Sequence, residues 1–199
     1  MLLQGANKPL AIPYAVDFHQ WESILVALDD TMMIAGPAPS AGQVAKTVKI
    51  GERTVVANLP FLKALGMVTD DSTASRITPG MAGMLYASAV AAGDAQGQQN
   101  ILYECSRRGL RPVVRFCEVD DELNFDRLFM QIKFLARVGD SWGQHRDTAG
   151  PYRTGIYTAM AILVHAGIVG TQFLPTFSRK DNGDGNRRNY RRKHTVKRR

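Results

Sequence analysis

Two short segments of the chain place arginine and threonine at the start of an expected helix. In the first, Arg53 and Thr54 precede a run whose apolar residues recur at helical spacing, at positions 55, 59 and 62. In the second, Arg153 and Thr154 precede a similar run at positions 156, 160 and 163. When the second of two paired helices enters the major groove, its N-terminal residues meet base edges, where arginine can bond guanine and asparagine can bond adenine. These segments predict recognition of double-stranded DNA.

The residues expected to contact DNA in the helical regions are polar or cationic and lie off the apolar stripes. Lys46 and Lys49 are placed for phosphate contacts. The complete set is Lys46, Lys49, Arg53, Thr54, Asn58 and Arg76 in the first region and Arg153, Thr154, Tyr157 and Thr158 in the second. Acidic neighbours oppose this interpretation, because Asp70 and Asp71 at the tip of an expected hairpin, and Glu52 beside the surface, would repel phosphate.

The positive charge of the chain is concentrated at its C-terminal end. The net charge is +7, and residues 179–199 carry ten Lys or Arg against two Asp. A polyanion would therefore be held there first, through contacts without base preference that suit RNA as well as DNA. The tail residues expected at DNA are Arg179, Lys180, Arg187, Arg188, Arg191, Arg192 and Lys193. A charged run is also a common form of solvated surface, although this one exceeds what solubility requires.

An internal repeat organises the chain. Residues 40–68 and 141–169 align without a gap at an offset of 101, with Ser40 on Ser141 and Gly66 on Gly167. The apolar positions stay in phase throughout, as expected of a structural repeat. Each copy is predicted to hold two short helices joined by a tight turn. In the first copy Ser40 is the expected N-cap and Gly66 the expected C-cap, while Pro60 would kink the second helix or leave its first half irregular.

The remaining segments are predicted from periodicity and turn residues. Amphipathic helices are expected over 16–28 and 125–138, with Asp29 and Asp30 closing the first, and the two correspond at an offset of 107. Residues 80–109 indicate one or two helices with Asp94 as a cap between them, and 111–119 indicate a strand or a short connection. Residues 67–80 predict two short strands around a polar turn, and a second hairpin is expected after Val169.

Several function classes are disfavoured by composition. The four histidines are scattered, no phosphate-binding glycine loop or nucleophile motif occurs, and neither a metal nor a cofactor is expected, so we predict no enzyme activity. No apolar run is long enough to span a bilayer and no secretory signal is recognised, so no membrane partner is expected. Two cysteines favour a reducing compartment, hence the cytoplasm, and the nucleoid in a prokaryote.

The segment ERTVVANLPFLKALGMV, followed by a polar turn and RITPGM, resembles the third helix and wing of prokaryotic winged helix-turn-helix regulators and initiators. The usual spacer is missing from Ile77-Thr78-Pro79-Gly80. The resemblance covers about 65 residues per copy and implies a fold that is mainly α with small β-hairpins, in tandem winged helix-turn-helix units. It also implies a transcription-regulator-like or replication-initiator-like role.

These observations predict a non-enzymatic protein that binds double-stranded DNA through two recognition helices and a basic tail. Its expected parts are an N-terminal arm (1–14), a first winged helix (15–79), a helical linker (80–122) and a second winged helix with the tail (123–199). Homo-oligomerisation stays open. The alternative is a scaffold subunit whose winged helices bind protein while the tail holds RNA or DNA nonspecifically.

Overall fold

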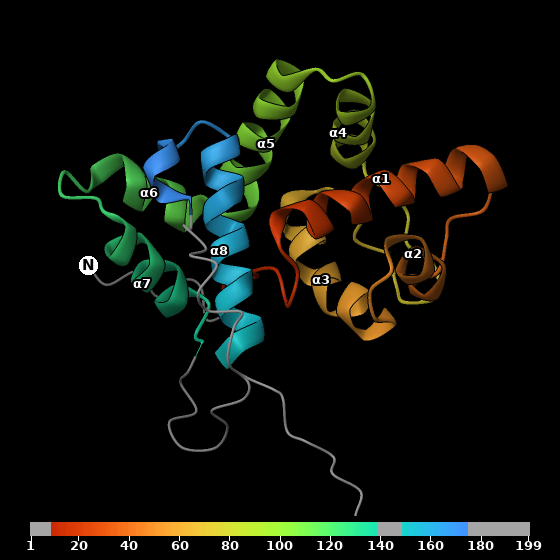
Figure 1. Ribbon diagram of the computed structural model, residues 1–199, viewed down its shortest axis with the longest axis horizontal. Coiled ribbons are helices and arrows are strands. Elements are labelled where there is room, and N and C mark those ends of the chain that lie inside the picture. The colour runs from red at the N-terminus through yellow and green to blue at the C-terminus, as the bar shows by residue number, and fades with distance from the viewer. Residues whose placement is uncertain (1–8, 139–148, 175–199) are drawn as a thin grey trace, which may run out of the picture.

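The structure is a computed structural model that describes residues 9–138 and 149–174 (Figure 1). Helices account for most of this part of the chain. They are α1 (Phe18–Ala35), α2 (Ala41–Val48), α3 (Glu52–Leu65), α4 (Met81–Ala91), α5 (Ala95–Gly109), α6 (Arg111–Val119), α7 (Phe125–Leu135), α8 (Ala149–His165) and the 3-10 helix η2 (Thr171–Phe173). The fold within these ranges is therefore helical.

The α2–α3 pair forms as the residue types predict. Ser40 caps α2 in a capping box, in which its hydroxyl accepts from the Gln43 amide and the Gln43 side chain accepts from the Ser40 amide. Lys49 takes the left-handed conformation after α2, with φ 59°, and lets the chain turn into α3. Gly66 ends α3 in the same left-handed region, with φ 74°. Both predicted caps are confirmed, and α3 stays helical on either side of the exposed Pro60.

The predicted winged fold is wrong. In the described residues no β-strand forms, and residues 67–80 contain only the isolated bridges Val68–Pro79 and Thr73–Arg76. The buried Ser72 hydroxyl replaces strand pairing, because it accepts from the Thr78 amide at 3.0 Å and donates to the Thr78 carbonyl at 3.2 Å.

The backbone of this loop also bonds to a segment outside the loop, since the Ile77 amide donates to the Pro39 carbonyl at 2.8 Å. After Val169 the chain forms η2, and the remainder of the expected second hairpin lies outside the described residues.

Two element boundaries also differ from prediction. Residues 111–119 form helix α6 instead of a strand or connection, because Pro112 suits the first turn of a helix, and Val113 and Val114 share a buried face. Helix α1 continues through Asp29 and Asp30 to Ala35, so the acidic pair does not close it. The expected Asp94 cap is confirmed, since its carboxylate accepts from the Gly97 amide at 2.9 Å.

The segment before α1 runs between α3, α7 and α8. The Leu10 amide donates to the Leu135 carbonyl of α7 at 2.9 Å, and the Ala15 amide donates to the Pro151 carbonyl of α8 at 3.1 Å. Gly155 allows the close approach, since a Cβ there would lie 1.8 Å from the Pro13 carbonyl oxygen. Residues 10–16 therefore join the two helices α7 and α8 of the second predicted copy to the start of α1.

Helices α3 and α8 have matching burial and matching C-terminal ends. Both pack against α5. Their buried residues include the aligned pairs Val55 and Ile156, Leu59 and Met160, and Leu62 and Leu163. Both helices end at a left-handed glycine, Gly66 or Gly167. The tight turn expected in the second copy at residues 151–152 is wrong, because α8 begins at Ala149, four residues before the position aligned with Glu52. The expected counterpart of α2 lies mostly at 141–148, outside the described residues, so duplication of the whole unit stays a prediction.

Candidate nucleic-acid interface

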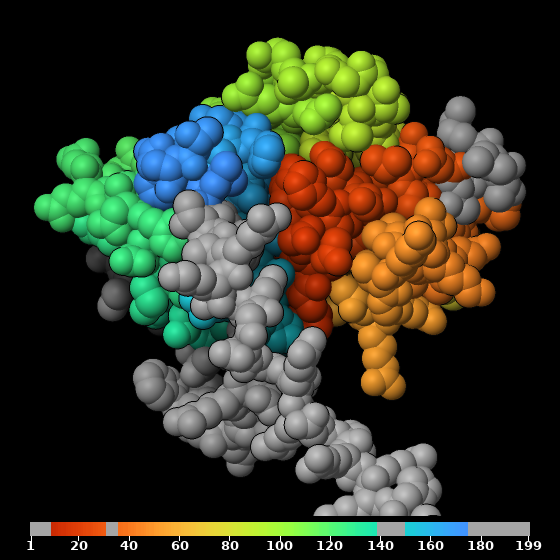
Figure 2. Space-filling view, in the orientation of Figure 1, coloured from red at the N-terminus to blue at the C-terminus, as the bar shows by residue number. Residues whose placement is uncertain are grey.

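The N-terminal ends of α3 and α8 both lie at the lower edge of the molecule in Figure 1. Arg53 is exposed in the first turn of α3, and Arg153 is exposed in the second turn of α8. In Figure 2 a long side chain of the α2–α3 region, coloured orange, projects from this edge. We call this surface the α3/α8 edge and define it by Lys46, Lys49, Arg53 and Arg153.

The cations of the α3/α8 edge have no carboxylate partner in the described part of the chain, where both ion pairs belong to Arg127. Arg153 instead donates through Nε to the Tyr157 hydroxyl at 2.9 Å, with its guanidinium 5.6 Å from the centre of that ring. Lys46 and Lys49 lie beside the turn into α3 and are exposed. Helix N-termini carry partial positive charge, so the arrangement suits phosphate.

Two residues expected at base edges are instead interior. Asn58 is fully buried, and its amide accepts from the Tyr14 backbone N–H at 3.0 Å and donates to the Tyr14 carbonyl at 2.9 Å. Thr158 is 2% exposed and donates to the Val16 carbonyl at 2.6 Å. Both side chains secure the segment before α1, which occupies the space where DNA was expected. Neither can reach a base in this fold.

Two further predicted residues on α8 are half-buried. The Thr154 hydroxyl donates to the Gly150 carbonyl at 3.2 Å. The Tyr157 ring lies 6.1 Å from Phe125 and 5.5 Å from Phe129 between centroids, so α7 covers one side of it. Thr54 on α3 is half-buried as well. Thr54, Thr154 and Tyr157 therefore expose less of their side chains at the α3/α8 edge than the sequence pattern predicts.

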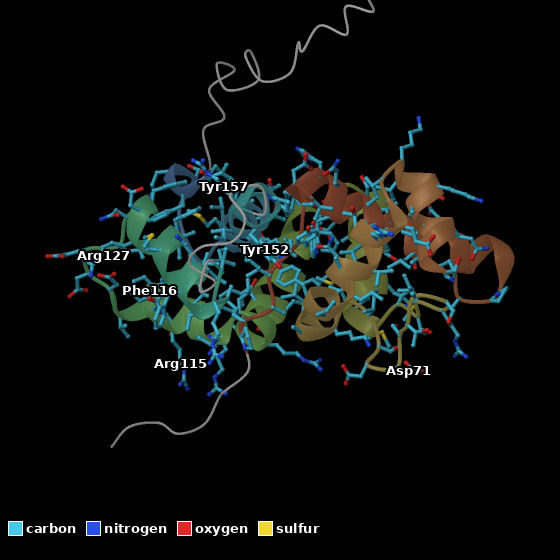
Figure 3. All side chains as sticks on the ribbon, turned by 90° about the horizontal axis from the view of Figure 1, so that it is seen from below. Asp71, Arg115, Phe116, Arg127, Tyr152 and Tyr157 are labelled. Carbon is cyan, nitrogen blue, oxygen red and sulfur yellow. The ribbon has the colours of Figure 1, made fainter. Side chains whose placement is uncertain are left out.

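The loop of residues 67–80 contributes charges of both signs. Arg76 is exposed, as predicted for a DNA contact. The Thr69 hydroxyl donates to the Asp71 carboxylate, and this hydrogen bond, more than the nearby Arg76 and Lys63, lowers the pKa of Asp71. Figure 3 views the molecule from below, onto the lower edge of Figure 1, and shows the charged Asp71 at the periphery of the molecule. Glu52 folds back over Gly42 of α2, because its carboxylate oxygen lies 3.3 Å from where a Gly42 Cβ would stand.

The predicted tail contacts lie outside the described residues and stay predictions. They are Arg179, Lys180, Arg187, Arg188, Arg191, Arg192 and Lys193.

A second cationic surface lies in the section that the sequence pattern indicated as a linker. Arg107 lies in the last turn of α5, and Arg111 and Arg115 follow on α6. The signal is visible in the sequence as arginine at every fourth position from 107 to 115. A four-residue spacing brings side chains together only on a helix. Because residues 111–119 are expected from sequence to be a strand or a connection, the spacing does not predict a cationic surface.

Burial shifts the pKa values of several titratable side chains in the described residues. No cluster of three His, Cys, Asp or Glu there could hold a metal ion. Burial raises the pKa of the Cys105 and Cys117 thiols to about 11, which keeps both in the poorly nucleophilic thiol form near neutral pH. His165 stacks on Phe18 with centroids 4.1 Å apart, and burial lowers its pKa.

Comparison with protein-family models finds no match for the chain, and comparisons with curated proteins and with solved structures also find none. None of the helices in the two described ranges is both long and apolar enough to cross a membrane.

Proposed function

We propose that the protein binds double-stranded DNA, without catalysis, through the α3/α8 edge. The observation that carries the proposal is the placement of two helix N-termini on one edge, each with an exposed arginine that lacks a carboxylate partner in the described residues. The positive ends of the helix dipoles and the arginines act on the same phosphates or bases. Lys46 and Lys49 extend the cationic surface beside α3.

The basic tail supplies a second, nonspecific component of binding. Its lysines and arginines release counterions from the phosphate backbone, so affinity depends steeply on salt and little on sequence. The α3/α8 edge is the component we expect to discriminate between sequences. Sequence-selective binding without catalysis is the activity of transcription regulators and replication initiators, and we propose a role of that kind.

The test compares two double variants of the full chain on duplexes selected from random DNA. Replacing Arg53 and Arg153 by Ala should lower discrimination between the selected duplex and a scrambled one by ~1–3 kcal/mol for each arginine that bonds a base. The matched control replaces Lys133 and Arg137 by Ala, which removes the same charge from α7 and the turn after it. Equal discrimination in both variants and the unmodified protein would refute the proposed edge.

A second candidate function is favoured by the apolar face of α3. A groove of about 870 Å³ is lined by Val56, Pro60 and Phe134, and Phe134 is 75% exposed. Such a surface fits a protein partner, with the tail holding RNA or DNA nonspecifically. Replacing the ten basic tail residues by Gln separates the candidates, because the scaffold would lose all DNA binding, whereas the DNA reader would keep a sequence-selective remainder.

A further inference from the structure

The junction of α5 and α6 gathers three arginines around one hollow. Leu110 alone joins the two helices, as the residue that ends α5 and precedes α6. The hollow, of about 260 Å³, is lined by Arg107, Arg111 and Arg115 with Val114 and Glu118. We call the three arginines and the hollow the arginine elbow. Figure 3 shows Arg115 toward the lower margin of the molecule, away from Tyr152 at the start of α8.

Ion pairing within the described residues does not account for these arginines. All three are exposed, and no ion pair in the described part of the chain joins them to Glu118 or to any other carboxylate. Arg111 is the first residue of α6, and Arg115 lies one turn further. Arg111 stands between the C-terminal end of α5 and the N-terminal end of α6, so the two helix dipoles act on it in opposite senses. The three like charges around one hollow repel one another, and an external anion would relieve that repulsion.

An exposed aromatic ring continues the arginine elbow along α5. Tyr103 lies one helical turn before Arg107 and is 36% exposed. The Arg107 guanidinium lies 5.7 Å from the centre of the Tyr103 ring, and its Nη1 donates to the Tyr103 hydroxyl at 3.4 Å. A tyrosine face held beside a guanidinium is the usual platform for stacking a nucleic-acid base.

We infer that Tyr103 and the arginine elbow bind single-stranded nucleic acid. The guanidinium groups of Arg107, Arg111 and Arg115 would hold successive phosphates, and Tyr103 would stack on one base. A base offers its face only when it is unstacked, which favours a single strand over a duplex. The three arginines lie four residues apart across the α5–α6 junction, so the arginine elbow accommodates a short stretch of strand. Glu118 also lines the hollow and adds one negative charge there.

This surface goes beyond the proposed duplex-binding function, since it uses different helices and does not depend on the α3/α8 edge. The inference can therefore hold where that function fails, and fail where that function holds.

The test measures binding of a labelled oligothymidylate to the full chain by fluorescence anisotropy over a range of salt concentrations. Tyr103→Ala should weaken binding by at least about fivefold, the lower limit for removing one stacked base. Tyr103→Phe keeps the ring and should stay within about twofold of the unmodified protein. Replacing Arg111 and Arg115 by Gln should reduce the slope of log affinity against log salt by about 1.4, because two single-strand phosphates are no longer neutralised.

Two controls make the outcome decisive. The Lys133→Gln, Arg137→Gln double variant removes the same charge from α7 and the turn after it, a region assigned no nucleic-acid contact, and should bind oligothymidylate unchanged. Circular dichroism should show that every variant is folded. An oligonucleotide carrying 5-iodouracil should photocrosslink to Tyr103 in the unmodified protein, which needs no variant. Unchanged affinity and slope in both elbow variants, an equal loss on duplex DNA, or crosslinks confined to other segments would overturn the inference.

Discussion

A substitution of Asn58 tests whether this residue reads DNA, as the sequence pattern predicts, or holds the fold together, as the structure indicates. Its side chain is fully buried and makes three hydrogen bonds, to the Tyr14 backbone N–H at 3.0 Å, to the Tyr14 carbonyl at 2.9 Å and to the Thr54 carbonyl at 2.8 Å. Asn58→Ala removes all three. The change leaves both backbone groups of Tyr14 without these partners.

The magnitude follows from those two groups. A buried polar group that loses its partner costs about 1–3 kcal/mol, and Tyr14 is half-buried, so each of its two groups falls near the lower end of that range. With the lost side-chain packing, Asn58→Ala should lower the free energy of unfolding by about 2–4 kcal/mol. The control Asn100→Ala removes an exposed amide that, among the described residues, is bonded to Gln96, and should change stability by less than about 0.5 kcal/mol.

Urea denaturation followed by circular dichroism measures both variants. DNA binding by the folded fraction of Asn58→Ala should keep its sequence selectivity, because the side chain does not face solvent. A variant that keeps its full stability and loses selectivity would show that Asn58 reads bases, and the structural assignment would be wrong.

Three further predictions concern other parts of the chain. Gly155→Ala should lower the free energy of unfolding by about 1–3 kcal/mol, because its Cβ would stand 1.8 Å from the Pro13 carbonyl oxygen. The control Gly150→Ala in the same helix places its Cβ in open space and should not destabilise the protein. Urea denaturation measures both variants. Burial raises the pKa of the Cys105 thiol from 9.0 to about 11. The contribution of the neutral thiol to the free energy of unfolding is therefore complete below pH 9 and is lost as pH rises toward 11, by up to about 3 kcal/mol. The stability that is lost between about pH 8 and pH 10 should therefore be smaller in Cys105→Ala than in the unmodified protein, as measured by urea denaturation at both values. Replacing the ten basic residues of 179–199 by Gln should flatten the salt dependence of duplex affinity by ~0.9 in slope for each phosphate that the tail no longer neutralises, whereas an unchanged slope in a salt titration would mean that the tail does not bind DNA.

Local signals in the sequence predict local structure well. Ser40, Gly66 and Asp94 are identified as caps from residue type and spacing alone, and the structure places a cap at each. Capping depends on side chains within a few residues of the helix end, so the sequence contains what is needed.

Long-range pairing is not predictable in the same way. The loop of residues 67–80 has the residue types of a hairpin, but Ile77 pairs with Pro39 and the Ser72 side chain takes the place of a ladder. Asn58 lies off the apolar stripe of α3, which predicts that it faces solvent. The segment before α1 covers it, and helical spacing cannot show which distant segment packs on a face.

The candidate site is only partly predictable for the same reason. Arg53 and Arg153 are expected at helix starts and are exposed there. That the two starts share one edge depends on how α3 and α8 pack against α5, which no spacing rule gives. The arginine elbow escapes prediction because its arginines gather only when residues 111–119 are helical.

Amide hydrogen exchange of the full chain, with and without a duplex selected from random DNA, tests the α3/α8 edge most directly. We predict slowed exchange on DNA binding in peptides that cover the first turns of α3 and α8, with little change in α4. Slowed exchange confined to residues 175–199, with both helix starts unaffected by a bound duplex, would contradict the account.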